Sequence, residues 1–384
     1  MQRSTDRILT THCGSLARPK ELLDVMKAKV NGEPYDAGAF ASRLRDAVAD
    51  VVRKQAECGV DIVNDGEQSK SGFFTYVGER LNGFEPVDGP SPRNWAEEVD
   101  EFPEYYEQYF SRAMMGRTIA RRVAIVCTAP ISYRGQEAIR RDIENLKSAL
   151  QDLQPTDIFM PAVAPSGVGE NRYYKTDEEY WHALADAMHS EYQAIVDAGF
   201  LVQIDDPFLT DTFSYSSSAK GDPRRTAEAY VEAVNQGLRG IPPEKVRYHT
   251  CYGINEGPRV HDAPLGDIAP FVLKVNAGAY SFEAANARHE HEYHIWENIK
   301  LPEGTILIPG VVTHASNIVE HPELIAERIV RYAKRVGREN VIAGTDCGFS
   351  SQATYHPEVH PKIVWAKFRA MAEGARLATK QLWG

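Results

Sequence analysis

Short apolar stretches alternate along the chain with longer amphipathic ones, and this alternation predicts the fold class. The short stretches are rich in β-branched residues, as buried strands are, and the segments between them have the apolar spacing of helices that cover a sheet. Nine strands are expected, at 8–15, 61–67, 121–132, 157–166, 200–207, 246–251, 277–283, 305–314 and 341–347. Helices are expected at 37–58, 136–152, 176–198 and 224–238. Strands that alternate with helices indicate an α/β fold with a parallel sheet.

A (β/α)8 TIM barrel needs only eight of these strands, so one of the nine is expected to lie outside it. We assign 121–132 to an extra hairpin outside the eightfold set. The segment 84–115 is acidic, aromatic and broken by prolines, which is typical of an insertion rather than of a barrel unit. The sequence therefore predicts one domain, a single barrel over 1–384 with an extra hairpin and an inserted acidic segment.

Composition narrows the class of protein. With 384 residues, 43% of them hydrophobic, the chain can bury a large core, and a net charge of −11 argues against nucleic acid or an anionic membrane as partner. No run of 18 apolar residues and no signal-peptide core occurs, so a cytoplasmic location is expected. The five cysteines are too few and too scattered for a disulfide framework, which favours metal ligation or burial. A monomer and a homo-oligomer both remain open.

A set of metal-ligand residue types recurs at the ends of the late strands. His249 and Cys251 are two positions apart, so both point to one face of an extended segment. Glu283, His314 and Cys347 follow at intervals of roughly 30 residues, the length of one strand-plus-helix unit. In a barrel these residues share one mouth. We interpret His249, Cys251, Glu283 and Cys347 as zinc ligands and His314 as a proton-transfer residue. One alternative has His314 rather than Glu283 as the fourth ligand, and the other is a set of buried core thiols with a core histidine and no metal.

The charge of this ligand set indicates the chemistry. Two thiolates and one carboxylate more than neutralise Zn²⁺, so such a site is poor at making hydroxide but suited to binding an incoming thiol as its thiolate. The reaction class expected is alkyl transfer to a zinc-bound thiolate. A zinc hydrolase or deaminase, which would need an open zinc–water site, and a non-catalytic zinc-binding barrel are the alternatives from other classes.

Several segments in order along the chain resemble the C-terminal catalytic domain of the cobalamin-independent methionine synthase family. They are TTHCGSLARP, DIVNDGEQSK, VQIDDP, YHTCYG, YSFEAAN, GVVTHASN and GTDCG. The resemblance implies a (β/α)8 barrel with zinc at its mouth and homocysteine as the methyl acceptor. It also implies that Ser15 contacts the homocysteine carboxylate and that Glu67 and Asp205 contact its ammonium group. The alternatives are a helix N-cap for Ser15 and ordinary ion pairs for the two carboxylates.

The resemblance leaves the alkyl donor as the main question. The family stacks a pteridine on a tryptophan, whereas 157–170 has none, and Tyr173, Tyr174 and Trp181 lie nearby. We predict methyl transfer from a methylated folate of the 5-methyltetrahydropteroyl-glutamate type to homocysteine, giving methionine. The alternative is the reaction of the related epoxyalkane:coenzyme M transferases, which open an epoxide with a zinc-bound thiolate. A sulfonate acceptor would need a cation, for which Arg18, Lys70 and Arg172 are candidates. Arg288 is expected to act as a partner of Glu283.

Overall fold

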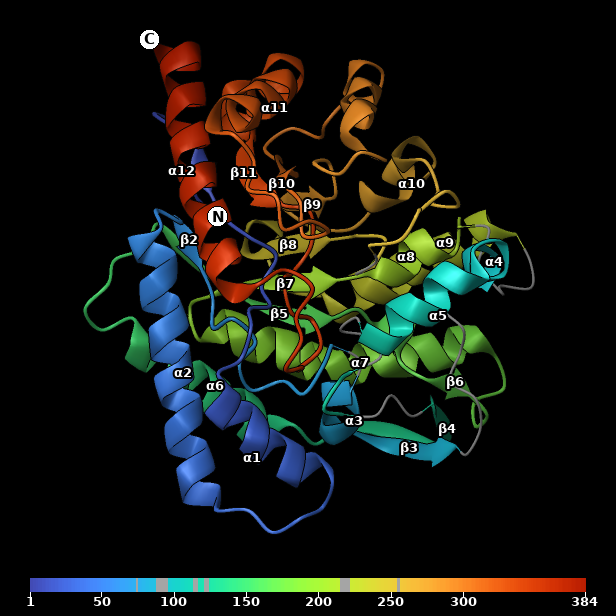
Figure 1. Ribbon diagram of the computed structural model, residues 1–384. Coiled ribbons are helices and arrows are strands. Elements are labelled where there is room, and N and C mark those ends of the chain that lie inside the picture. Colours follow the sequence, from blue (N-terminus) through green and yellow to red (C-terminus); the bar gives the residue numbers. More distant parts are fainter. Residues whose placement is uncertain (74, 88–95, 113–116, 121–123, 215–221, 254–255) are drawn as a thin grey trace.

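The computed structural model describes residues 1–73, 75–87, 96–112, 117–120, 124–214, 222–253 and 256–384 (Figure 1). Eight strands form one parallel sheet in the order β1-β11-β10-β9-β8-β7-β5-β2. Their bounds are β1 Leu9–Thr10, β2 Ile62–Val63, β5 Asp157–Val163, β7 Leu201–Asp205, β8 Val246–His249, β9 Ala279–Phe282, β10 Ile306–Val312 and β11 Ile342–Thr345. The outer strands meet where Asp61 N donates to Thr10 O, so the sheet curls into a nearly closed barrel. All eight strands assigned to the barrel from the sequence are confirmed.

A second, small sheet lies beside the barrel. Its strands are β3 (Leu81–Val87), β4 (Ala124–Tyr133) and β6 (Glu170–Asn171), with β3 antiparallel and β6 parallel to β4. The prediction that 121–132 lies outside the eightfold set is therefore confirmed for 124–132, whereas 121–123 lie outside the described residues.

The four predicted helices are present within three residues of their expected ends, as α2 Ala37–Glu57, α6 Gln136–Ala149, α7 Asp177–Asp197 and α9 Pro223–Gly237. At the start of α7 the Thr176 side chain accepts a hydrogen bond from Glu179 N, which satisfies an otherwise free N–H. The further α-helices are α1 Lys20–Val30, α3 Thr75–Arg80, α8 Pro207–Asp211, α10 Leu265–Val272, α11 Pro322–Val336 and α12 Pro361–Trp383. Short 3₁₀ helices lie at Pro165–Gly167, Pro243–Lys245, Glu290–Glu297 and Arg338–Asn340. Within the described ranges, none of the helices has the length and apolar character needed to span a membrane.

The first residues of the predicted insertion 84–115, 84–87, belong to β3, so its predicted start was too early. The rest lies between β3 and β4 and contains α4 (Ala96–Glu101) and α5 (Pro103–Arg112), while 88–95 and 113–116 lie outside the described residues. The two helices lie against loops at the carboxyl ends of barrel strands, in cyan in Figure 1. Tyr105 Oη donates to Glu256 O in the loop after β8, and Tyr109 Oη donates to Glu358 in the loop after β11. The inserted segment therefore covers part of the barrel mouth.

The interior of the barrel is layered, because alternate residues of each strand point inward. An apolar layer holds Leu9, Ile62, Phe159, Leu201, Ala279, Ile306, Ile308 and Ile342. Moving two residues along β7 from Leu201 reaches Gln203, and two more reach Asp205 at the carboxyl end. Strand register places Asp205 beside His249, and His249 beside Ser281. The polar residues of the mouth are thus fixed by the same alternation that builds the apolar core.

Candidate metal centre

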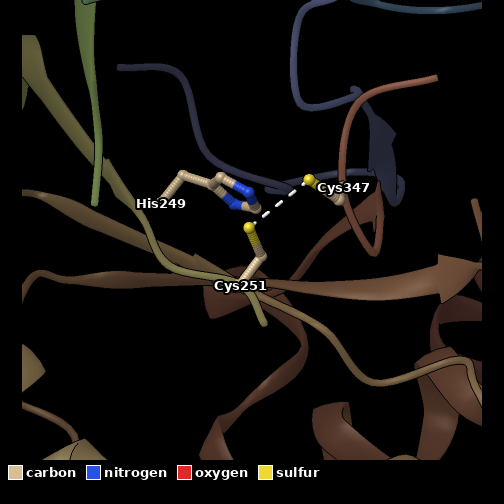
Figure 2. A group of neighbouring side chains, drawn as sticks. All are labelled: His249, Cys251 and Cys347. Atoms are coloured by element: carbon tan, nitrogen blue, oxygen red, sulfur yellow. Dashed lines mark hydrogen bonds between the residues drawn. The ribbon is translucent and has the colours of Figure 1, made fainter. Parts of the chain in front are cut away.

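Three predicted zinc ligands converge at the carboxyl ends of β8 and β11 (Figure 2). His249 ends β8, Cys251 follows two residues later, and Cys347 lies two residues beyond the end of β11. The sulfur atoms of Cys251 and Cys347 are 3.4 Å apart, and they and a ring nitrogen of His249 lie within 4.8 Å of one another. Two thiolates of a tetrahedral zinc site, with Zn–S bonds of about 2.3 Å, lie about 3.8 Å apart. The spacing of the two sulfurs is thus close to what a zinc ion requires.

The surroundings of His249 suit a neutral metal ligand. Burial lowers the pKa of His249 to about 3, so the imidazole is neutral at physiological pH. Its Nδ1 lies 3.1 Å from Ser281 Oγ, whereas its buried Nε2 has no hydrogen-bond partner among the described residues. A buried polar atom without a partner is costly, and a metal ion on Nε2 would remove that cost.

The two thiols need a cation to ionise. The hydrogen bond with Cys251 and burial raise the pKa of the Cys347 thiol well above its usual range. A divalent cation bound to both sulfurs reverses this effect, because it favours the thiolate over the thiol. The two sulfurs, His249 Nε2 and their burial together fit zinc.

Glu283, the fourth predicted ligand, lies in a neighbouring group with His314 and Asp346 rather than in the group of the two cysteines. Its Oε1 accepts a hydrogen bond from Tyr252 N at 2.8 Å. Its Oε2 accepts from Asn286 Nδ2 at 2.8 Å and forms an ion pair with Arg259 Nη1, also at 2.8 Å. Both carboxylate oxygens therefore already have partners within the protein.

The arginine that pairs with Glu283 is Arg259, and the expectation that Arg288 would have this role was wrong. Arg288 is exposed, and its guanidinium donates to Val260 O at 3.5 Å. Arg259 is buried, lies 24 positions before Glu283 and has a positive φ of 57°, a conformation that sequence patterns do not reveal.

His314 is buried beside Glu283 and Asp346. Its ring makes a hydrogen bond to the Gly253 backbone, and neither ring nitrogen has a side-chain hydrogen-bond partner in the described part of the chain. Burial lowers the pKa of His314 to about 4, although the charge of Asp346 opposes this. The Asp346 carboxylate itself accepts hydrogen bonds from Ala284 N and Ala285 N, both at 2.7 Å, and so holds the loop that carries Glu283.

The three predicted substrate residues are buried, Ser15 and Glu67 in the loops after β1 and β2 and Asp205 at the end of β7. Burial and the charge of Glu67 raise the pKa of Asp205 well above its usual range, so these two carboxyl groups lie close together. Glu67 has a positive φ of 54°, and Lys70 Nζ lies 3.3 Å from its Oε2. Ser15 Oγ accepts from Ser350 N at 3.3 Å, and Ser15 does not cap helix α1, which begins after Pro19.

Of the three histidines in the tract after Glu283 (His289, His291 and His294), one is buried beside the metal centre. His289 is buried, stacks on Tyr252 at 4.0 Å between ring centroids, and contacts Asp262 and Glu292. Although burial lowers it, these two carboxylates raise the pKa of His289 to about 9. His289 therefore belongs to the charge network around Arg259 and Asp262.

The cations considered for a sulfonate acceptor have other partners. The Arg18 guanidinium donates to the carbonyl oxygens of Leu16, Glu67, Lys70 and Ser350. Lys70 Nζ donates to Pro161 O at 2.7 Å. Arg172, half exposed, lies 3.5 Å from the Glu170 carboxylate.

Comparison with known proteins identifies related sequences over the whole chain. The family model described as "Cobalamin-independent synthase, Catalytic domain" matches residues 168–371, more than half of the sequence. The methionine synthase of Sulfurisphaera tokodaii is 24% identical over 379 residues, which cover 97% of this chain and 93% of that protein. The methionine synthase of Sulfolobus acidocaldarius is 27% identical over 381 residues, with the same two coverages.

Solved structures show the same architecture. A B12-independent methionine synthase from a Shewanella species, in complex with selenomethionine, has a TM-score of 0.73 at 19% identity, covering 98% of this chain and 99% of that one. A protein described as a putative vitamin-B12 independent methionine synthase, from Listeria monocytogenes, has a TM-score of 0.66 at 20% identity, with the same coverages. At these identities the likeness shows a shared fold.

Proposed function

The chain belongs to the family of cobalamin-independent synthase catalytic domains, and on that premise we propose that it is a zinc-dependent S-methyltransferase that converts homocysteine to methionine. The observation that carries this proposal is the buried group of two cysteine sulfurs and the unpartnered Nε2 of His249 at the barrel mouth. We propose a methylated folate as the donor. In this proposal the one barrel binds both substrates.

The proposed metal ligands are His249, Cys251 and Cys347, with the Glu283 carboxylate as a weaker fourth ligand. Zinc held by these residues supplies a Lewis acid that binds a thiol as its thiolate and leaves the sulfur nucleophilic. Their two negative sulfurs keep the site electron-rich, which disfavours the hydrolase alternative. Glu283 is the ligand most readily replaced, because its oxygens have protein partners and a carboxylate is the hardest donor of the set.

The residues proposed to bind homocysteine match the two ends of an amino acid. Glu67 and Asp205 accept the ammonium group, whose positive charge favours the ionised form of Asp205 against the burial and the charge of Glu67 that raise its pKa. Ser15 offers its hydroxyl to the carboxylate group. A coenzyme M sulfonate would instead need a free cation, and the three cations considered for it are engaged elsewhere.

His314 is proposed as the proton-transfer residue. It is buried beside Glu283 and Asp346, and its ring nitrogens have no side-chain hydrogen-bond partner among the described residues. Its imidazole is therefore available to a bound substrate. We propose that it delivers a proton to the leaving nitrogen of a folate donor, while the proton of the substrate thiol is released to the solvent.

Calorimetric titration of the zinc-loaded protein tests this function. Homocysteine should bind with release of about one proton, counted in two buffers of different ionisation enthalpy, because the bound thiol ionises. The Glu67→Gln variant should bind homocysteine about 10–100-fold more weakly, since it loses a charge-assisted hydrogen bond. A homocysteine analogue that lacks the amino group is the matched control and should bind both proteins equally. Binding of coenzyme M alone would support epoxide opening, and binding of neither thiol would reject thiol alkylation.

A further inference from the structure

The buried arginine beside the metal centre has no role in the function proposed above. Arg259 is only 4% exposed, and its Nη1 lies 2.8 Å from Glu283 Oε2. On its other side, Arg259 Nε donates to Asp262 Oδ2 at 2.7 Å, and Asp262 also contacts His289 Nε2 at 3.1 Å. The guanidinium thus lies between Asp262 and the carboxylate that is the proposed fourth metal ligand.

The backbone of Arg259 is held in an unfavourable conformation by the inserted segment. A residue other than glycine keeps a φ of 57° only where its surroundings fix it, and such residues gather at functional sites. Here Arg259 N donates to the buried carboxylate of Glu98, which lies on α4. His261, two residues on, contacts Glu101 of the same helix at 2.8 Å. Helix α4 therefore fixes the position of the Arg259 backbone, and with it the direction of the Arg259 side chain.

Glu283 has two competing cationic partners. A buried carboxylate needs a positive charge, and losing that charge without replacement is costly. Arg259 supplies this charge through its direct ion pair, and a metal ion bound to the cysteine sulfurs would compete with it. A metal bond to Glu283 draws the carboxylate toward the sulfurs, whereas the ion pair with Arg259 draws it toward the loop after β8.

We propose that Arg259 is a positioning residue that competes with the metal for Glu283, and that helix α4 holds Arg259 in place through Glu98. This inference rests on the proposed function and extends it, because it names the group that receives Glu283 when the substrate thiol takes its place. By stabilising the displaced carboxylate, Arg259 keeps the fourth metal position accessible to homocysteine. The inserted segment thereby tunes the affinity of the site for its thiol substrate.

The test is a double-mutant cycle on zinc affinity, measured by competition with a chromophoric chelator in the absence of substrate. Arg259→Gln should tighten zinc binding about tenfold, since Glu283 then loses the cation that pairs with it directly and competes with the metal. In a Glu283→Gln background the same substitution should leave the zinc affinity unchanged. Weaker zinc binding in Arg259→Gln, or an equal effect in both backgrounds, would overturn the proposal.

Variants of α4 and of the neighbouring arginine supply the controls. Glu98→Ala should shift zinc affinity in the same direction as Arg259→Gln, whereas Glu98→Gln should not, because an amide oxygen still accepts from Arg259 N. Arg288→Gln removes an exposed guanidinium that does not contact Glu283 and should change nothing. Should Arg259→Gln fail to fold, the two Glu98 variants carry the test, and equal zinc affinities for them reject the proposal.

Measuring homocysteine binding distinguishes a failure of this inference from a failure of the proposed function. Arg259→Gln should weaken homocysteine binding about tenfold at saturating zinc, because Glu283 then competes with the thiol. If the unaltered protein bound no homocysteine, the proposed function would be wrong. The double-mutant cycle on zinc affinity would still decide whether Arg259 competes with the metal for the Glu283 carboxylate.

Discussion

At the scale of single residues, replacing His314 should slow the methyl-transfer step without weakening the binding of zinc or homocysteine. Its imidazole has no side-chain hydrogen-bond partner in the described chain and contacts only the Gly253 backbone there, so removing it disturbs little of the surrounding network. We expect His314→Ala to lower the turnover of methyl transfer about 10²–10⁴-fold, the usual contribution of a general acid or base. Zinc content and the homocysteine dissociation constant should stay as in the unaltered protein. Loss of zinc from this variant would instead identify His314 as a metal ligand.

Site residues at or next to a strand end could be predicted from the sequence, whereas those in loops could not. His249 and Cys251 share a face because alternation along an extended segment is a local rule. The partner of Glu283 could not be found in this way. Arg259 reaches it through a loop whose course is fixed by Glu98, more than 150 residues earlier in the chain. Arg288 is much nearer to Glu283 in the sequence, but its side chain is exposed and donates to Val260 O instead.

At the scale of elements, the pairing of β10 with β11 positions Cys347, and Gly310 allows the two strands to approach closely. A Cβ added at Gly310 would lie 2.0 Å from Asp346 Oδ1 and 2.7 Å from Asp346 Cα. Gly310→Ala should therefore push the strands apart, lower the free energy of unfolding by about 1–3 kcal/mol, and weaken zinc binding.

The matched control for Gly310 is Gly78, on helix α3. A Cβ at Gly78 would meet no atom within 4 Å, and alanine is the better helix former, so Gly78→Ala should be neutral or slightly stabilising. Urea unfolding curves of the two variants make the comparison. An equal effect of both substitutions would mean that close approach of β10 to β11 is not what Gly310 provides.

Elements were predictable where their residues follow one periodicity. The capped helix α7 and the buried strands β7 and β8 lie close to where the sequence predicts them. Strand β3 was missed, because its sequence LNGFEPV contains asparagine, glycine and proline, which are typical of turns. The strand is stabilised by its pairing with β4, about 40 residues later in the chain. The local sequence of β3 does not reveal that pairing.

At the scale of the whole molecule, a metal at the barrel mouth would join strands that are distant in the chain. His249 and Cys251 follow β8, and Cys347 follows β11 nearly a hundred residues later, so metal binding and barrel stability are linked. A ligand present at 100 times its dissociation constant stabilises the folded state by about 2.7 kcal/mol. Removing zinc with a chelator should therefore lower the unfolding midpoint by a few degrees.

Two cysteine variants separate this linkage from the general loss of a buried thiol. Cys347→Ser removes a proposed ligand, so its unfolding midpoint should be lowered and should no longer respond to the chelator. Cys58→Ser removes a buried thiol that contacts Trp365 O and Arg369, remote in the fold from the sulfur pair, and the chelator response should persist. A chelator response of the same size in both variants would mean that the ion binds elsewhere in the chain. A response lost only in Cys347→Ser would establish that the barrel is held together at its mouth by the metal that its sequence predicts.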